Sequence, residues 1–418
     1  MFFLLSQKAH EGVFSRKEDG GPCAYGRLLA VNCMKVQKTR VPFSAEQNEW
    51  MLSMLPAGCD PERVVFWDIE TTGFSRQYDS VYLMGYFYWE QHQPYIEQHL
   101  AASTTEEIEL LELCLEKLGD FDVVISFNGD TFDVPFVKDR LQQMRVNGSF
   151  PSIQSWDLYK QYRPYASFFG WESCKLKSIE RFLHLDRRDT MNGGELIEVF
   201  YEYSRTEDPQ LEKTLLLHNY EDILNLPALL RIDAYVRYLQ NCSVVDIQVK
   251  QEAEAQLSLS FLMSKASPLA LKTCFYAQKK SVPIQLRTDY QESTLCLTIP
   301  LCQDTLRYYL PNYKEYYILP SGNLLHKSLD TPPQKKTATR AECYLPKEGT
   351  FLPIPKPTAW QGLHPFQYNY KDKQVYYDCE EINSWLPQRT EEERRLFLNQ
   401  FLPFSKTQSK SEDKRHAR

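Results

Sequence analysis

Short apolar runs and amphipathic stretches alternate along residues 61–240. The runs at residues 64–69, 80–89 and 122–127 are rich in β-branched and aromatic side chains, which is typical of buried strands. In the stretches between and after them, apolar residues recur every three or four positions, and this spacing predicts helices. The predicted helical segments are residues 104–119, 134–144, 175–183, 194–203 and 211–239. This succession predicts an α/β domain over residues 61–240.

The pattern changes on either side of that domain. Residues 1–60 lack strong periodicity and are predicted to form an N-terminal segment with one or two short strands in "YGRLLAVNCMKVQ". In residues 243–404, Val, Thr, Tyr and Leu alternate with polar residues between prolines and glycines, which predicts a β-rich C-terminal domain. Residues 405–418 are polar and are predicted to form a disordered tail.

Composition narrows the cellular setting. The 11 cysteines are scattered without a CxxC pair, so neither a zinc knuckle nor a disulfide framework is indicated, and a reducing cytoplasm is favoured. The apolar run "MFFLL" at the start is too short for a signal peptide. No stretch approaches the roughly 20 apolar residues of a membrane span. We therefore expect a soluble, cytoplasmic protein without membrane contact.

Charge divides along the same boundary. Residues 61–240 contain 17 Lys and Arg against 30 Asp and Glu, a net charge of −13, whereas the whole chain carries −7. The remainder is therefore +6. An acidic domain would concentrate metal ions, and the basic remainder would contact phosphates if nucleic acid is the partner. Chance variation of surface charge explains the division equally well.

Two acids interrupt an apolar strand. In "VVFWDIETTGF", Asp68 and Glu70 are two residues apart, so their side chains project from the same face of the predicted strand. An isolated carboxylate is costly in an apolar setting and is normally paired, metal-bound or protonated. The spacing therefore indicates that a cation lies between the two side chains.

Three further residues have competing interpretations. Asp133 precedes the helix start Val134-Pro135, where it is either a helix cap or a ligand. His218 and Asp222 are four apart on a predicted helix and share a face, either as an exposed pair or as part of a site. Tyr220 is two residues from Asp222, which rotates it by about 200° on a helix.

The order of these acids resembles a known family. "DIETTG" (68–73), "FNGDTFDVPF" (127–136) and "HNYEDILNL" (218–226) resemble the three motifs of the DEDD exonucleases, the DnaQ-like branch of the ribonuclease H-like superfamily. The second motif is most similar to that of family-B polymerase proofreading domains. The intervening "SWDLYKQYRPY", "CKLKSIERFL" and "NGGELIEVFYEY" resemble the bacterial YprB-like ribonuclease H-like domain proteins. The resemblance covers about residues 61–240.

One position departs from the family pattern. The proofreading branch has Tyr four residues before the last Asp, and the other branch has His five residues before it. This chain has His218 four residues before Asp222, a combination of the two. The identity of the residue that orients the attacking water, His218 or Tyr220, is therefore an open question at this stage.

The resemblance implies a fold and an activity. We expect a five-stranded mixed sheet with flanking helices, and a metal-dependent 3′→5′ exonuclease that acts on single-stranded DNA or RNA. Two Mg²⁺ or Mn²⁺ ions are implied. The alternatives are a structure-specific endonuclease and a catalytically idle protein that only binds nucleic acid.

The resemblance also assigns roles to residues. Asp68 would bridge the two ions, Glu70 and Asp222 would hold the ion that activates water, and Asp133 would support the second ion. His218 would orient or deprotonate the water, since an imidazole titrates near neutral pH. The residues implied to contact the substrate are Thr71 and Asn128.

Two segments of the C-terminal domain have a second possible use. The tyrosines of "YYLPNYKEYY" (308–317) either pack within a sheet or stack on bases, as aromatics do in single-strand grooves. The basic stretch "PPQKKTATR" (332–340) is either a solvated loop or a contact for phosphates.

Overall fold

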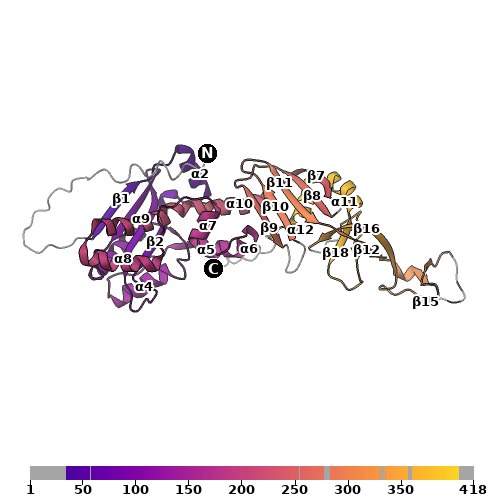
Figure 1. Ribbon diagram of the computed structural model, residues 1–418, viewed down its shortest axis with the longest axis horizontal. Coiled ribbons are helices and arrows are strands. Elements are labelled where there is room, and N and C mark those ends of the chain that lie inside the picture. The colour runs from indigo at the N-terminus through magenta and orange to yellow at the C-terminus, as the bar shows by residue number, and fades with distance from the viewer. Residues whose placement is uncertain are drawn as a thin grey trace, which may run out of the picture. The chain divides into compact units, whose positions relative to one another are not determined.

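The computed structural model describes residues 34–56, 58–253, 255–276, 283–329, 332, 334, 336–355 and 360–403. The predicted tail and most of the predicted N-terminal segment lie outside the described residues. The chain divides into two compact units. The first unit comprises residues up to 166 and residues 171–234, and the second comprises residues 167–170 and those from 235 onward. Figure 1 labels their elements.

A mixed sheet forms the centre of the first unit, with strand order β1-β4-β3-β2-β5-β6. Its strands are β1 Lys35–Arg40, β2 Val64–Thr71, β3 Val81–Glu90, β4 Gln93–Leu100, β5 Val123–Ser126 and β6 Gln154–Asp157. Strands β1 to β4 are mutually antiparallel neighbours, whereas β5 and β6 run parallel to β2. The predicted fold class is confirmed, with one difference in strand number. The sheet has six strands rather than five because β1 adds an edge strand beside β4.

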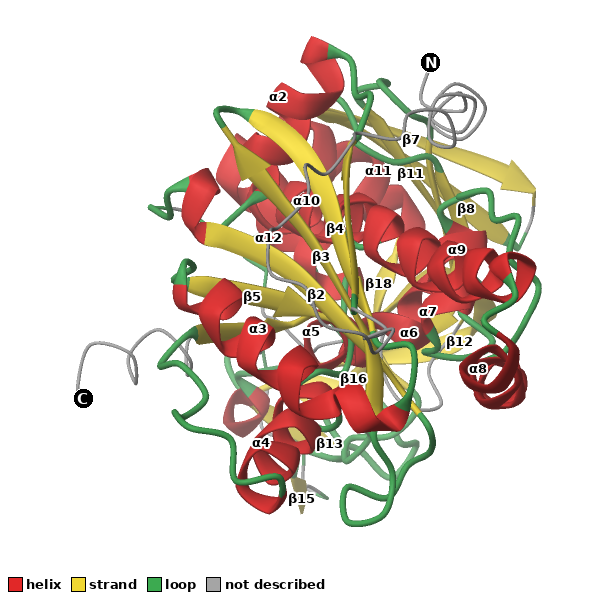
Figure 2. Cartoon of the chain, turned by 90° about the vertical axis from the view of Figure 1, so that its left-hand side faces the viewer, coloured by secondary structure: helices red, strands yellow, loops and turns green. Residues whose placement is uncertain are grey.

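Helices cover both faces of this sheet (Figure 2). They are α2 Ala45–Met54, α3 Glu107–Gly119, α4 Asp133–Gln143, α5 Leu158–Tyr162, α7 Leu176–Phe182, α8 Gly193–Thr206 and α9 Pro209–Asn225. Two more, α6 Ala166–Phe169 and α10 Leu230–Asn241, include residues of both units. Figure 2 shows α3 and α4 on one face and α8 and α9 on the other. Among the described residues, no helix is both long and apolar enough to cross a membrane.

The segment predicted as helical over residues 211–239 is interrupted. Helix α9 ends at Asn225, and a short 3-10 turn (η5, Pro227–Leu229) precedes α10. Proline lacks an amide hydrogen and its ring crowds the preceding turn, so Pro227 ends the regular helix. The interruption lies after Asp222 and therefore leaves the spacing between His218 and Asp222 helical.

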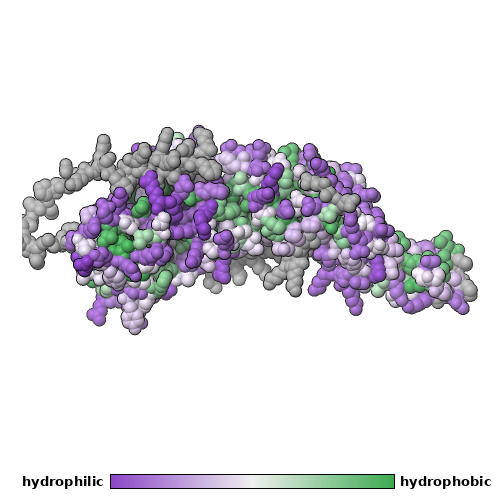
Figure 3. Space-filling view, in the orientation of Figure 1, coloured by the Kyte–Doolittle hydropathy of each residue, from purple (hydrophilic) through white to green (hydrophobic). Residues whose placement is uncertain are grey.

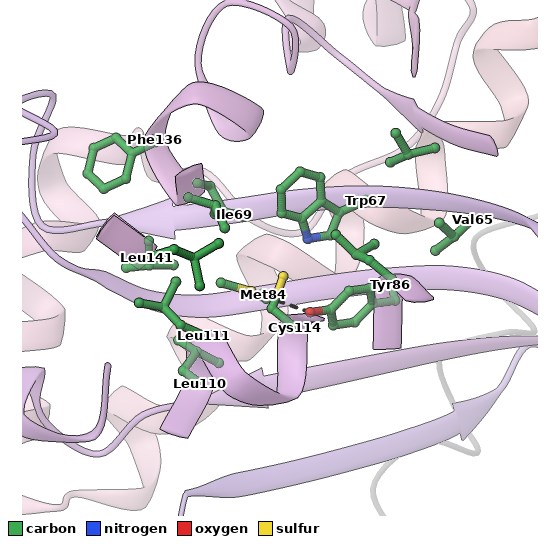
Figure 4. Close-up of a cluster of buried hydrophobic side chains, with 14 of the residues drawn as sticks. Val65, Trp67, Ile69, Met84, Tyr86, Leu110, Leu111, Cys114, Phe136 and Leu141 are labelled. Atoms are coloured by element: carbon green, nitrogen blue, oxygen red, sulfur yellow. Dashed lines mark hydrogen bonds between the residues drawn. The ribbon is translucent and has the colours of Figure 1, made fainter. Parts of the chain in front are cut away.

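The two faces of β2 differ in chemistry. Val65, Trp67 and Ile69 pack with residues of α3 and α4 in one hydrophobic core (Figure 4). Because strand side chains alternate, Asp68 and Glu70 project from the opposite face, toward α9. The apolar side chains anchor the strand, and the acidic ones are held on the face that α9 covers.

A glycine on β3 lets α9 approach the sheet closely. Gly85 pairs with Asp68 across the β2–β3 ladder. A Cβ atom at Gly85 would lie 2.2 Å from Asn219 Oδ1 and 2.7 Å from Ile223 Cγ1, distances that no side chain tolerates. The missing side chain thus allows the middle of α9 to contact the acidic face of the sheet.

The second unit contains three separate sheets, as expected for a β-rich domain. A five-stranded sheet has the order β7-β8-β11-β10-β9, four strands close into a barrel (β12-β16-β18-β17), and a small sheet has the order β14-β13-β15. The strands are β7 Val244–Ala253, β8 Gln256–Met263, β9 Leu271–Tyr276, β10 Pro283–Thr288, β11 Thr294–Pro300, β12 Cys302–Tyr309, β13 Tyr316–Ile318, β14 Leu324–His326, β15 Lys336–Thr337, β16 Tyr344–Ile354, β17 Phe366–Gln367 and β18 Val375–Asp378. Helices α11 Cys379–Trp385 and α12 Glu391–Phe401 follow.

Candidate active site

Asp68 and Glu70 lie beside the middle of α9 and are partly accessible to solvent. Asn219 of α9 donates a hydrogen bond from Nδ2 to Asp68 Oδ2 at 3.2 Å. The amide of Asn219 is itself oriented by Gln98, whose Nε2 donates to Asn219 Oδ1 at 2.9 Å. This chain of amides fixes the carboxylate of Asp68 without neutralising its charge.

Asp133 is the first residue of α4, but its carboxylate does not cap that helix. The N-cap position is Phe132, where no side-chain cap is formed. Instead, Asp133 Oδ1 accepts a hydrogen bond from the backbone amide of Ile69 at 3.1 Å. Strand β2 runs past its last pairing with β5, at Phe66, and Asp133 occupies the edge that β5 leaves uncovered. The carboxylate is therefore directed at the strand segment between Asp68 and Glu70.

His218 and Asp222 share one face of α9, as their spacing predicts. His218 Nε2 lies 3.5 Å from Glu70 Oε1 and 3.6 Å from Asp222 Oδ2. The His218 side chain is only 6% exposed and that of Asp222 is 14% exposed, so the two do not form a solvated pair. Tyr220 is buried too, and burial with the nearby charge of Glu221 raises its pKa to about 12. The imidazole of His218, rather than the phenol of Tyr220, therefore lies beside Glu70 and Asp222.

Two further residues, which the sequence patterns did not single out, contact His218 and Asp222. Asp189 Oδ2 lies 2.7 Å from His218 Nδ1, so Nδ1–H donates to the carboxylate and Nε2 faces Glu70 and Asp222. Arg187 Nη1 forms an ion pair with Asp222 Oδ1 at 2.5 Å. Both residues belong to the segment between α7 and α8, in the charged run "DRRD".

That segment is anchored to α9 by its backbone. The carboxylate of Glu221 accepts hydrogen bonds from the amides of Arg188 and Asp189, each at 2.9 Å. Arg187 is further held by Glu180 of α7, with Nη1 2.9 Å from Oε2. Because the contacts with Glu221 join residues 33 and 32 positions apart, local periodicity does not reveal them.

Burial and mutual repulsion raise the pKa values of the acids at this site. Burial raises the pKa of Asp68 well above its usual range, and the charges of Glu70, Asp133 and Asp222 add to the shift. Burial also raises the pKa of Glu70 to about 7, despite the opposing effect of His218. For Asp133, burial outweighs its backbone hydrogen bonds and raises the pKa to about 7. These carboxylates lack sufficient positive charge around them.

The pKa of the His218 imidazole is raised as well, but there the shift favours the charged form. Burial by itself lowers the pKa of His218, but the hydrogen bond to Asp189 and the charges of Glu70 and Asp222 outweigh burial and raise it. Burial likewise opposes the shift of Asp189, whose hydrogen bonds with His218 and Lys177 hold its pKa well below the usual range. The Asp189–His218 pair is therefore electrostatically stable, whereas Asp68 and Glu70 remain uncompensated.

The donor set suits a hard metal ion. Glu70, His218 and Asp222 each offer one ligand atom, and these atoms lie within 4.8 Å of one another. The hydroxyl of Tyr82 is buried close by and has no hydrogen-bond partner among the described residues. Its pKa is raised mainly by burial and further by the charges of Glu70 and Asp68. Carboxylate oxygens are the preferred ligands of Mg²⁺ and Mn²⁺. The excess of acid over base at this edge fits divalent cations.

The predicted substrate contacts lie at the last residue of β2 and in the loop after β5. Thr71 Oγ1 donates to the carbonyl of Gly73 at 2.7 Å, at the end of β2. Asn128 follows β5 with a φ of 70°, and its amide donates to Asp157 Oδ1 at 2.9 Å. Three residues after Thr71, the ring of Phe74 is 86% exposed, the highest exposed fraction among the large apolar side chains of the described residues.

Comparison with known proteins places residues 65–232 within the match of a family model described as "RNase_H superfamily". A curated relative, the uncharacterised protein YprB of Bacillus subtilis, is 24% identical over 219 residues. The match covers 51% of this chain and 51% of YprB, so the chain spans about half the length of that relative.

Solved structures resemble the chain at low identity. The family B DNA polymerase of the archaeon Pyrobaculum calidifontis has a TM-score of 0.32 at 14% identity, covering 82% of this chain and 46% of the polymerase. The Nibbler EXO domain of Aedes aegypti has a TM-score of 0.27 at 15% identity, covering 45% and 83%. Exonuclease I of E. coli in complex with a dT13 oligonucleotide has a TM-score of 0.25 at 8% identity, covering 53% and 54%.

Proposed function

We propose that the domain formed by residues 65–232, which match the ribonuclease H superfamily model, is a metal-dependent 3′→5′ exonuclease acting on single-stranded DNA or RNA. The observation that carries the proposal is the convergence of Glu70 and Asp222 on the buried imidazole of His218, with Asp68 held by Asn219 within reach of the charges of Glu70 and Asp222. The acids come from β2 and α9, and Asp133 joins them through the amide of Ile69.

The four carboxylates would hold two Mg²⁺ or Mn²⁺ ions, with Asp68 shared between them, Glu70 and Asp222 at one ion and Asp133 at the other. When bound, two such ions stabilise the attacking and leaving oxygens of a phosphodiester hydrolysis. Asp222 offers Oδ2 for this role, because Arg187 occupies Oδ1. The raised pKa values of Asp68, Glu70 and Asp133 support the assignment, since acids that repel one another gain most from added cations.

His218 would orient the attacking water and accept its proton at Nε2. The hydrogen bond from Nδ1–H to Asp189 fixes the ring and leaves Nε2 toward Glu70 and Asp222. Asp189 is in this account a positioning residue. Bound cations would oppose the effect of the carboxylates on the pKa of the imidazole and would favour the neutral ring, which accepts a proton at Nε2.

Substrate would be held at the end of β2 and by the loops that follow β2 and β5. Thr71 and Asn128 offer polar groups there, and both are partly accessible. The exposed ring of Phe74, edge-on to Phe132 at 6.2 Å, provides an apolar face on which a terminal base would stack. An unstacked base requires a single-stranded end, which supports single strands as the substrate.

Two alternatives make different predictions. A structure-specific endonuclease would use the same acids but would cut a strand without free ends. An idle nucleic-acid-binding protein would need no divalent ion, and the repulsion among Asp68, Glu70 and Asp133 would then only destabilise the fold.

All nine described cysteines are free thiols, which agrees with the proposed location in a reducing cytoplasm.

The test is hydrolysis of end-labelled DNA and RNA single strands by the full chain with Mg²⁺, with Mn²⁺ or with EDTA. We expect products with either ion and none with EDTA. A matched control, Asp120→Ala, removes an exposed carboxylate of the same unit and should leave the rate unchanged. Hydrolysis that persists in EDTA, or binding without any hydrolysis in Mg²⁺ and Mn²⁺, would overturn the proposal.

A further inference from the structure

A cluster of aromatic and basic side chains lies on the outside of the barrel in the second unit. We call it the tyrosine–arginine surface, and its members are Tyr309, Tyr313, Tyr344, Tyr370, Arg307 and Arg340. Tyr309 and Tyr344 are direct cross-strand partners in the β12–β16 ladder, with ring centroids 5.6 Å apart. Tyr370 lies edge-on to Tyr309 at 5.3 Å.

The two arginines are packed against these rings. The guanidinium carbon of Arg307 lies 4.8 Å above the ring of Tyr344, and that of Arg340 lies 5.2 Å above Tyr313. Hydrogen bonds with Tyr370 and Tyr313 raise the pKa of Arg340. The four tyrosines and two arginines thus form one continuous network of planar groups.

The barrel does not need this network for its core. The core consists of Leu306, Phe351 and Phe366, and Tyr308 packs against it. Because side chains alternate along β12, Tyr309 projects from the opposite side to Tyr308. Of the two uses of the tyrosine run, packing within the sheet accounts for Tyr308 and leaves Tyr309 unexplained.

Charge distinguishes this surface from the candidate active site. Residues 301–378 contain ten Lys and Arg against seven Asp and Glu, whereas the first unit is strongly acidic. Among the described residues, no carboxylate pairs with Arg307 or Arg340, whereas Lys336 is paired with Glu342. Arg307 Nη1 donates to the backbone carbonyl of Tyr368 at 3.0 Å and to Asn369 Oδ1 at 3.3 Å, both uncharged acceptors, so the charge of each arginine is left for an external anion.

The kind of partner follows from this chemistry. The visible face of the barrel around β12 and β18 is largely hydrophilic, which does not favour an apolar partner (Figure 3). Tyrosine rings present flat faces for bases, and guanidinium groups present donors for phosphates. In a duplex the bases are stacked on one another and cannot reach such rings, so the surface fits a strand with exposed bases.

We propose that the tyrosine–arginine surface binds single-stranded nucleic acid, with the tyrosines stacking on bases and the arginines contacting phosphates. This surface is a second binding site, separate from the acids of the first unit. Binding there requires neither a divalent ion nor hydrolysis, so the inference goes beyond the proposed function and can fail independently of it.

The experiment measures fluorescence anisotropy of a labelled oligothymidylate of about 20 nucleotides, enough to fill one typical site. The protein is the full chain carrying Asp68→Ala, in EDTA, so that hydrolysis does not interfere. A duplex of the same length is measured beside it. We expect the single strand to bind more tightly than the duplex and its affinity to fall with salt.

Variants locate the binding. Tyr370→Ala and Arg340→Gln should each weaken binding about ten-fold, the effect of one lost stacking or phosphate contact. Both side chains are exposed, so the fold should be kept. Tyr276→Ala and Arg287→Gln are matched controls in the five-stranded sheet of the same unit, and Arg287 is already paired with Asp289. They should have little effect.

Three results would overturn the inference: no binding of the single strand, equal binding of single strand and duplex, or equal losses in the surface variants and their controls. Each of these leaves the hydrolysis assay untouched, because that assay reports the acids of the first unit. Conversely, a chain that binds as described but fails to hydrolyse would contradict only the proposed function.

Discussion

Two sets of carboxylates in the first unit differ in what opposes their charge. Glu107 is fully buried, and both of its oxygens accept hydrogen bonds from Arg140, at 2.8 Å and 2.5 Å. Glu97 is paired with Lys117 at 2.8 Å. Asp68 and Glu70, in contrast, form no ion pair with a Lys or Arg of the described chain.

The difference separates carboxylates that hold the fold together from carboxylates that await a ligand. Glu107 is balanced within the chain and also accepts a hydrogen bond from the amide of Val81, so it ties α3 to both α4 and β3. The set at the edge of β2 is balanced only if cations come from outside. The contrast leads to predictions in which stability and activity change independently.

The largest expected effect is on catalysis. Asp68→Ala should abolish hydrolysis, because it removes the shared metal ligand. The melting temperature of the metal-free protein should stay unchanged or rise slightly, because repulsion with Glu70 is relieved. Cleavage rates in Mg²⁺ and thermal unfolding in EDTA measure the two effects.

The control for this prediction is the balanced carboxylate. Glu107→Gln leaves Arg140 buried without its charge partner, so the free energy of unfolding should fall by about 3 kcal/mol. Cleavage near the wild-type rate in Asp68→Ala, or a large loss of stability in that variant, would remove the distinction between the two sets.

Asp133→Asn should lower the cleavage rate by orders of magnitude at nearly unchanged stability. The asparagine oxygen can still accept the hydrogen bond from Ile69, but the negative charge is gone. Asp130→Asn is the matched control, since Asp130 lies in the turn just before α4 and is paired with Lys160. If both variants cleave at the wild-type rate, Asp133 serves the structure alone.

His218→Ala should lower the rate by roughly 10²–10⁴, the usual contribution of a positioned acid or base. His218→Tyr should recover part of that loss, because it restores the arrangement of the proofreading branch. Tyr220→Phe should matter little, since His218 is the residue that lies beside Glu70 and Asp222. A severe loss in Tyr220→Phe together with a mild one in His218→Ala would show that the site is built around the tyrosine.

The smallest effect concerns pH and the balanced set. Burial opposes the shift of Glu97, but hydrogen bonds from His99, Lys117 and Tyr88 outweigh it and hold its pKa well below the usual range. A lowered folded-state pKa contributes stability that is present above the unfolded value of about 4.3 and is lost as pH falls below it. The free energy of unfolding of the wild type should therefore fall between about pH 4 and pH 2 more steeply than that of the Glu97→Gln variant. The measurement is urea denaturation at a series of pH values. Equal slopes of the unfolding free energy against pH in the two proteins would contradict this assignment.

Local periodicity was enough to predict part of the site. The two-residue spacing of Asp68 and Glu70 and the four-residue spacing of His218 and Asp222 each place a pair on one face, and the structure bears out both geometries. The helical segment predicted over residues 211–239, in contrast, is divided at Pro227, after α9.

Tertiary contacts account for what the sequence did not reveal. Asp189 reaches His218, and Asn219 reaches Asp68, only because α9 packs against Gly85 and the segment before α8. Strand β6 has four residues of mixed polarity, so it carries no periodic signal. Pairing with β4, which the local pattern does not specify, places β1 in the sheet as its sixth strand.

The polarity of degradation tests the central claim most directly. Single-stranded DNA and RNA oligomers are incubated with the full chain and Mg²⁺, with a block on the 3′ end, a block on the 5′ end, or as closed circles. We expect a ladder that shortens from the 3′ end, arrest by the 3′ block, no effect of the 5′ block, and intact circles. Internal cuts in the circles, or degradation from the 5′ end, would contradict the account.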